Sequence, residues 1–126
     1  MPSQIERTLE EYGVNWRAIP EGFRQEAEGI LLNKLGIQGF TVEIPAELAN
    51  KFEQIRRNLH SLSKIIGTNI GISIIYVLYP DKFYRGVGKN FEDQLDSALI
   101  TRIELLASQH GLPIPKRDSG PSLPLS

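Results

Sequence analysis

Six apolar residues recur at steps of four and three along residues 45–66, and this spacing constrains the fold more than any other feature of the chain. They are Leu48, Phe52, Ile55, Leu59, Leu62 and Ile66. Alternating steps of four and three place side chains on one side of an α-helix, in the narrow pattern of helices that pack against a partner helix. Pro45 suits the first turn of such a helix, and Gly67 suits its end. The pattern predicts one long helix over 45–66, and we call the six residues the seam.

Two partners for the seam are compatible with the sequence. The first is intramolecular, because helices predicted at 20–35 and 91–110 also carry apolar residues at helical spacing. The second is another copy of the chain, because the predicted helix is long for a domain of 126 residues. We favour packing within the chain and keep self-association open.

The remaining pattern predicts an α+β fold that is mainly helical. A short helix at 3–12 begins at Ser3, a good N-cap residue, with Glu6 three positions later. Residues 40–44 alternate and 70–79 are apolar and β-branched, so both are predicted as strands, although a buried helix at 70–79 fits the periodicity as well. The predicted core consists of Phe23, Ile30, Leu31, Leu48, Phe52, Ile55, Leu59, Leu62, Ile75, Val77, Leu99 and Ile103.

Residues 1–112 are predicted to form a single globular domain. Residues 113–126 are rich in proline and serine and contain no aromatic residue. Such a composition cannot bury enough apolar surface to offset the loss of chain entropy. We therefore expect a disordered C-terminal tail.

Composition removes several classes of chemistry. The chain has no cysteine and a formal net charge of −1, so thiol chemistry is excluded and no global field attracts nucleic acid or an anionic membrane. Its only histidines, His60 and His110, belong to no metal-binding spacing. No nucleophile–base pair is visible, so an enzyme is the least favoured class and we predict no metal or cofactor. We expect a soluble, cytoplasmic protein that does not cross a membrane.

One segment, residues 82–91, has a composition suited to binding anions or nucleic acid. Basic side chains can contact phosphates, aromatic rings can stack on unpaired bases, and glycines can turn backbone N–H groups toward an anion. The candidate residues are Lys82, Phe83, Tyr84, Arg85, Gly86, Gly88 and Lys89. The segment matches neither the phosphate-binding loop nor the RNA-recognition octamer. An ordinary connecting loop whose aromatic residues fold back on the core is therefore the favoured interpretation.

A secondary basic face is predicted on the long helix, on the side away from the seam. Arg57, His60 and Lys64 lie there at helical spacing, and Glu53 is placed to pair with Arg57. Such a pair favours an ordinary solvated face.

The order of a strand at 40–44, a helix, Gly67-Thr68 and a second apolar segment resembles that of ribbon-helix-helix DNA-binding proteins. That resemblance implies a helix at 69–79 and a strand that pairs with its copy in a dimer. It has no diagnostic motif, and we assign no family.

From the sequence, the favoured function is a small non-catalytic accessory or adaptor subunit. It would act through contacts with itself or with another protein in a larger assembly. The alternative is nucleic-acid binding through residues 82–91.

Overall fold

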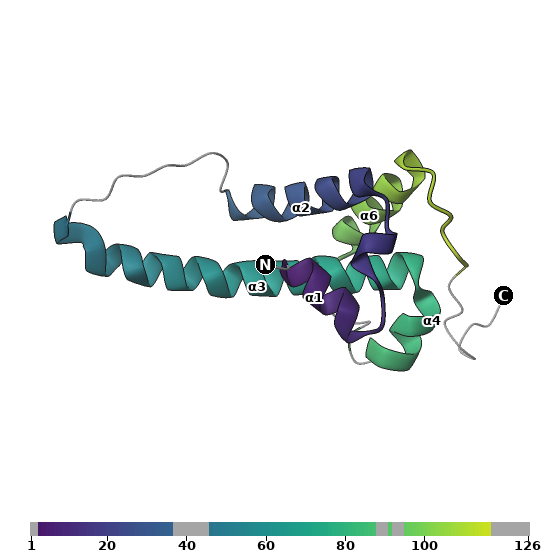
Figure 1. Ribbon diagram of the computed structural model, residues 1–126, viewed down its shortest axis with the longest axis horizontal. Helices are drawn as coiled ribbons and strands as arrows, with labels where there is room; N and C mark the ends of the chain where they lie inside the picture. Colours follow the sequence, from purple (N-terminus) through teal and green to yellow (C-terminus); the bar gives the residue numbers. More distant parts are fainter. Residues whose placement is uncertain (1–2, 37–45, 88–90, 92–94, 117–126) are drawn as a thin grey trace.

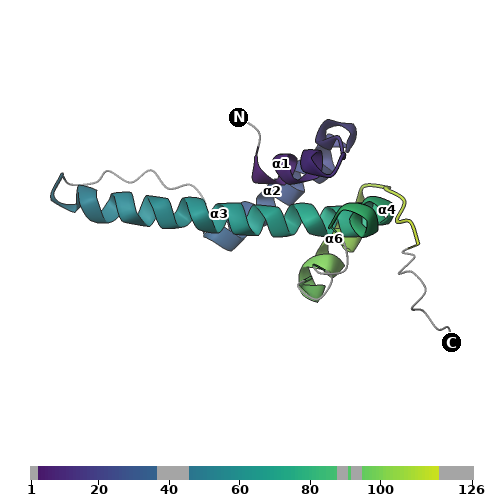
Figure 2. The same ribbon diagram turned by 90° about the horizontal axis from the view of Figure 1, so that it is seen from below.

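The computed structural model describes residues 3–36, 46–87, 91 and 95–116, which form helices grouped along one long helix (Figures 1 and 2). The α-helices are α1 (Gln4–Glu11), α2 (Glu21–Leu35), α3 (Ala49–Leu78), the single turn α4 (Pro80–Lys82) and α6 (Ser97–Gln109). Two 3-10 turns, η1 (Trp16–Ala18) and η2 (Ala46–Leu48), and a π-helical turn, η3 (Phe83–Val87), complete these elements. No residue in these described ranges lies in a strand, so the predicted α+β class is wrong.

Helix α3 is the axis of the molecule. Its 30 residues correspond to a length of about 45 Å at 1.5 Å per residue. In Figures 1 and 2 the other helices gather around its C-terminal half, whereas its N-terminal half extends beyond them. The protein therefore consists of a helical body and a projecting segment of α3.

The apolar run at 70–79, predicted as a strand, forms the C-terminal part of α3 as far as Leu78. Its residues Ile70, Ile72, Ile74 and Ile75 are at most 2% exposed, because α1, α2 and α6 all pack against α3. A helix that is covered on all sides must be apolar all round, and such a run looks the same in sequence as a buried strand. Tertiary packing here overrides the strand preference of the β-branched residues.

Two glycines let α1 approach α3 closely, and neither ends a helix. A Cβ added to Gly67 would lie 2.7 Å from the Cβ of Gln4, and one added to Gly71 would lie 2.8 Å from the Cβ of Thr8. Thr8 is buried, and its hydroxyl donates a hydrogen bond to the carbonyl oxygen of Gln4 at 2.9 Å. The predicted end of the long helix at Gly67 is therefore wrong, because Gly67 and Gly71 form the surface on which α1 packs.

Caps explain where the other helices begin and end. The hydroxyl of Ser3 accepts a hydrogen bond from the backbone N–H of Glu6 at 3.2 Å, which confirms the predicted N-cap of α1. Helix α2 ends at Gly36 in a left-handed conformation with φ of 67°. Helix α6 begins later than predicted because the carboxylate of Asp96 accepts from the N–H of Ala98 at 2.9 Å.

The core lies in the body and differs in part from the predicted one. Phe23, Leu31, Ile75, Val77, Leu99 and Ile103 are buried as predicted, and Ile30 packs partly buried against them. The prediction is wrong for Leu48, Ile55 and Leu62, which are exposed, and for Phe52 and Leu59, which are only partly covered. Their places are taken by unpredicted core residues before α2 and after α3: Ile5, Leu9, Val14, Trp16, Ile19 and Phe83.

The strand predicted at 40–44 lies outside the described residues. Residues 69–78 are helical, as the ribbon-helix-helix resemblance implied, but they continue the preceding helix without a break. The break at Gly67-Thr68 between two helices, which that resemblance required, is therefore not found within α3.

Candidate interaction surface

The projecting segment of α3 carries the most unusual surface of the described chain. We call residues 46–66 the arm. Along its length the seam residues Leu48, Ile55 and Leu62 are 47%, 52% and 44% exposed, and Ile65 beside them is 58% exposed. Only the last seam residue, Ile66, packs against the core cluster. The seam therefore forms an apolar stripe that the described residues leave largely open to solvent.

Single exposed leucines are common on protein surfaces, but a continuous apolar stripe is not. Monomeric soluble proteins rarely expose large contiguous apolar patches, and such patches commonly mark sites of interaction. The helical spacing of these residues also fits a partner helix, because side chains at a/d positions insert between those of a facing helix. Among the described residues, α2 and α6 leave Leu48, Ile55 and Leu62 exposed, so the favoured packing of the seam on these two helices is wrong for those three residues.

The opposite face of the arm is basic and solvated. Arg57, His60 and Lys64 are all exposed there, as predicted. Glu53 forms its ion pair with Arg56 (3.0 Å from Oε1 to Nη2) rather than with the predicted Arg57, since both positions lie one turn away on a helix. The arm is therefore amphipathic, with the stripe on one side and the three basic residues on the other.

The structure separates the residues of the 82–91 segment into core and surface. Phe83 is fully buried, and its ring lies edge-on to Tyr76 at 4.9 Å and to Tyr84 at 5.1 Å between centroids. A Cβ at Gly86 would lie 2.8 Å from the ring of Tyr12. These aromatic contacts hold η3 against the body.

Two candidate cations of this segment remain on the surface. Lys82 and Arg85 are exposed, whereas Gly88 and Lys89 lie outside the described residues. Phe83 has no free face on which a base could stack, and Tyr84 is partly buried. What the described part of the segment offers to a ligand is thus positive charge, and binding of nucleic acid there stays a prediction.

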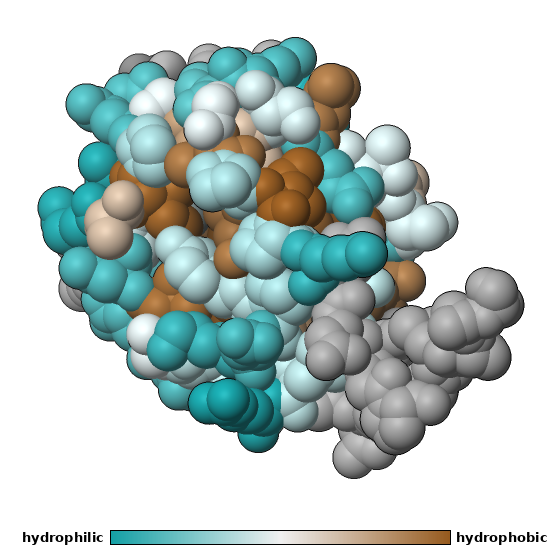
Figure 3. Space-filling view, turned by 90° about the vertical axis from the view of Figure 1, so that its right-hand side faces the viewer, coloured by the Kyte–Doolittle hydropathy of each residue, from teal (hydrophilic) through white to brown (hydrophobic). Residues whose placement is uncertain are grey.

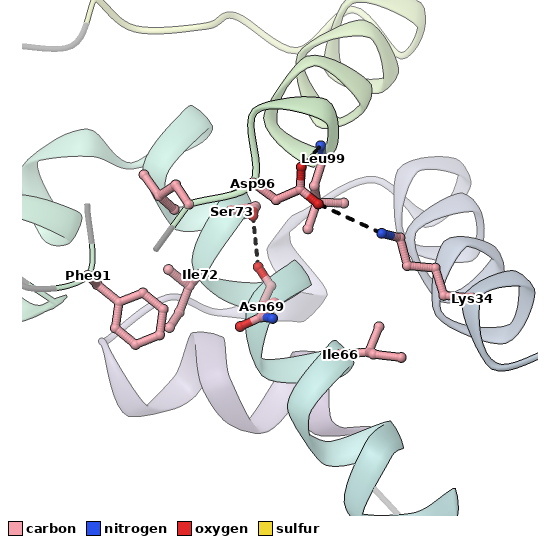
Figure 4. Close-up of a pocket in the computed structure, with 9 residues that line it drawn as sticks. Lys34, Ile66, Asn69, Ile72, Ser73, Phe91, Asp96 and Leu99 are labelled. Atoms are coloured by element: carbon pink, nitrogen blue, oxygen red, sulfur yellow. Dashed lines mark hydrogen bonds and ion pairs between the residues drawn. The ribbon is translucent and has the colours of Figure 1, made fainter. Parts of the chain in front are cut away.

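A small cavity lies where the arm joins the body, between α2, α3 and α6 (Figure 4). Its volume of about 70 Å³ is far below the roughly 300 Å³ or more of ordinary ligand pockets. Lys34 of α2 and Asp96 at the start of α6 face each other across its rim at 4.0 Å, and Ser73 donates a hydrogen bond to the backbone oxygen of Asn69 at 2.8 Å. The cavity is suited to water. The Lys34–Asp96 ion pair joins α2 to the start of α6, whereas the hydrogen bond of Ser73 lies within α3.

A second apolar hollow lies at the end of the body that faces away from the arm. Figure 3 looks at that end and shows apolar side chains among polar ones. The hollow has a volume of about 160 Å³ and is lined by Ala18, Ile19, Pro20, Leu78, Tyr79, Leu112, Pro113 and Pro115. Burial raises the pKa of the Tyr79 phenol above its ordinary value of 10.0. In the part of the chain that the structure describes, no charged side chain lines this hollow, and the Tyr79 phenol is its one polar side chain.

The two histidines take different places. His60 is exposed on the arm, and His110 follows α6, where its Nε2 lies 2.7 Å from Oε2 of Glu26. The ring of His110 also meets the ring of Phe23 edge-on, at 6.4 Å between centroids. His110 thus joins the end of α6 to α2, a contact that helical spacing within one segment could not predict. Among the described residues, no group of three potential ligands could hold a metal ion.

Within the described ranges, one helical stretch, Ala46–Leu78, is long and apolar enough to cross a membrane by length and composition alone, with a mean hydropathy of 1.5 over an 18-residue window. However, 44% of its apolar window is buried inside the protein. A core helix needs the same composition, and the C-terminal part of α3 is a core helix.

Comparison of the chain with protein-family models, with curated proteins and with solved structures gave no match. The function must therefore be inferred from the geometry of the chain itself.

Proposed function

We propose that this protein is a small non-catalytic accessory or adaptor subunit that joins a larger assembly through the apolar stripe of its arm. The observation that carries the proposal is the exposure of Leu48, Ile55 and Leu62 on one face of a helix that stands away from the core. A partner helix laid along the stripe would cover all three at once. We propose that the protein binds this partner in solution in the cytoplasm.

The apolar area of the stripe fits a reversible contact. Full burial of a leucine or isoleucine contributes about 1.5–3 kcal/mol, so covering a half-exposed one contributes about 1 kcal/mol. The half-exposed residues are Leu48, Ile55, Leu62 and the adjacent Ile65, and the partly covered ones are Phe52 and Leu59. Together they give about 5 kcal/mol, and a similar face on the partner doubles this to about 10 kcal/mol. The cost of association is about 4–15 kcal/mol. The stripe therefore supports an association that depends on concentration rather than a permanent one.

Site-specific photo-crosslinking in cells tests the proposal. A photoreactive amino acid at position 55 faces the expected partner, whereas the same amino acid at position 57 lies on the opposite face of the arm. We expect protein adducts from position 55 and few from position 57. Adducts of equal yield from both positions would contradict a specific contact through the stripe.

Two further variants show whether such adducts depend on the stripe. Leu62→Lys, added to the crosslinking chain, should abolish the adducts from position 55. Leu105→Lys is the matched control, because Leu105 of α6 is 52% exposed but belongs to the body. It should leave the adducts unchanged.

Nucleic-acid binding is the second candidate function. It is supported by the exposed basic face of Arg57, His60 and Lys64, which a partner on the stripe would leave free, and by the exposed Lys82 and Arg85. Fluorescence anisotropy with labelled single-stranded DNA and RNA should then show binding at low salt that weakens steeply as salt is added. Absence of binding at about 50 mM salt, where electrostatic contacts are strong, would rule this candidate out.

A further inference from the structure

We infer that the partner of the arm is a second copy of this chain, with the two arms antiparallel and aligned over residues 48–66. This inference rests on the proposed function, because it names the occupant of the same stripe. The orientation and the register follow from the spacing of the stripe and from the helical body that lies beyond Ile66.

The spacing of the stripe is the same in both directions. From Leu48 to Ile66 the steps are four, three, four, three and four, so a reversed copy places every apolar residue opposite another. Leu48 then meets Ile66 of the second copy, Phe52 meets Leu62, and Ile55 meets Leu59. Such pairs of a with d positions form the core of antiparallel helix pairs. No apolar residue of the stripe is left without a counterpart.

The body blocks the parallel arrangement. Beyond Ile66 the same side of α3 continues through Asn69, which is exposed, to Ser73, which is buried, and Lys34 of α2 and Leu99 of α6 lie there around the small cavity (Figure 4). In a parallel pair the second body would have to occupy that space. In the antiparallel pair the second arm reaches the body only with its first residues, so the two bodies lie at opposite ends.

The flanks of the stripe favour the same orientation. In a parallel pair the g position of one helix faces the next e position of the other, which brings Lys51 to Arg56 of the second copy twice per dimer. In the antiparallel pair Lys51 faces the apolar Ile65 instead, so its aliphatic stem can cover a side chain that is 58% exposed. The remaining like-charge contact, between the two Arg56 residues, is relieved by Glu53, which lies 3.0 Å from Arg56 in each chain.

The orientation can be tested by disulfide trapping because the chain has no cysteine. The full-length variants Ile55→Cys and Leu59→Cys, one of them isotopically heavy, are mixed and oxidised gently. The antiparallel register places positions 55 and 59 opposite each other, so mixed disulfides should clearly exceed the share of about half that random pairing of equal amounts would give. A parallel register would instead give homodimers of each variant and would overturn the inference. Leu48→Cys mixed with Leu59→Cys is the matched control, since these positions lie apart in both registers.

The mass in solution tests the occupant itself. Light scattering up to about 1 mM, where even a millimolar Kd is visible, should approach twice the monomer mass of 14.2 kDa. Ile55→Lys should weaken the dimer about 100-fold, because the change occurs twice and each loss is worth about tenfold. Leu105→Lys should not.

A monomer at every concentration would overturn this inference. Stripe-dependent crosslinks from position 55 to a different protein would then leave the proposed function standing, whereas their absence would remove both.

Discussion

Replacing Gly71 by alanine should destabilise the protein even though alanine is the better helix former. Gly71 lies inside α3, where the change from glycine to alanine alone is worth about 1 kcal/mol in favour of the helix. The new methyl group, however, would lie 2.8 Å from Cβ and 2.9 Å from Cγ2 of Thr8, and 3.3 Å from Cδ1 of Leu9. Thr8 and Leu9 are both buried, so neither can move into solvent.

The net effect follows from these two opposing terms. Overpacking of a well-packed core typically costs about 1–3 kcal/mol, so a net loss of up to about 2 kcal/mol in the free energy of unfolding is expected. Gly29→Ala is the matched control, because Gly29 lies in the middle of α2 with nothing within 4 Å of an added Cβ. That variant gains only from the higher helix propensity of alanine and should be more stable than the parent protein by about 0.5–1 kcal/mol.

Urea denaturation followed by circular dichroism measures both variants against the parent protein. The midpoint should fall for Gly71→Ala and rise for Gly29→Ala, with the slope unchanged in each case. If both variants were stabilised to the same extent, α1 would not lie on α3 as described. If both were destabilised, the helix term would have been misjudged.

Three further changes address the body and the tail. Phe83→Ala should lower the free energy of unfolding by about 3–5 kcal/mol, as for other buried phenylalanines. A loss below about 1 kcal/mol in the same denaturation assay would show that Phe83 is not a core residue. Burial raises the pKa of the Tyr79 phenol, so the stability contributed by the neutral phenol is complete below pH 10.0 and is lost as pH rises through the pKa of the folded state. Above pH 10.0, Tyr79→Phe should therefore lose less stability than the parent protein. Identical pH profiles of the two proteins would contradict this. Deletion of residues 114–126 should leave the melting temperature nearly unchanged, and a fall of several degrees would show that Ile114 or Pro115 contributes to the fold.

Much of the local structure could be predicted because it depends on neighbours in sequence. The Ser3 cap, the left-handed Gly36 and the apolar faces of α2 and α6 each require residues within a few positions of one another. The helix predicted at 91–110 begins too early because several polar residues precede α6, and only the structure shows that Asp96 is its N-cap.

The candidate binding segment predicted at 82–91 is divided into buried and exposed residues, and the sequence did not show this division for a similar reason. Two basic residues flank two aromatic residues at 82–85, and that pattern does not reveal whether a ring points to solvent or to the core. The partners of Phe83 are Tyr76 on α3 and Tyr84 beside it, and contact with Tyr76 depends on α3 continuing to Leu78. Because α3 is helical at Tyr76, the ring of Phe83 packs into the core, and Lys82 and Arg85 remain exposed.

The arm shows where periodicity stops being informative. The spacing from Leu48 to Ile66 identified correctly which residues share a face, because that depends only on the helix. What covers a face depends on where other elements lie, and α1, α2 and α6 are too short to cover the whole of α3. They bury the half that is apolar all round, since that half has no polar side to turn toward water. The half with a single apolar stripe can keep Arg57, His60 and Lys64 solvated on its other side. The division of α3 into core and arm therefore follows from the two hydrophobic patterns within one helix.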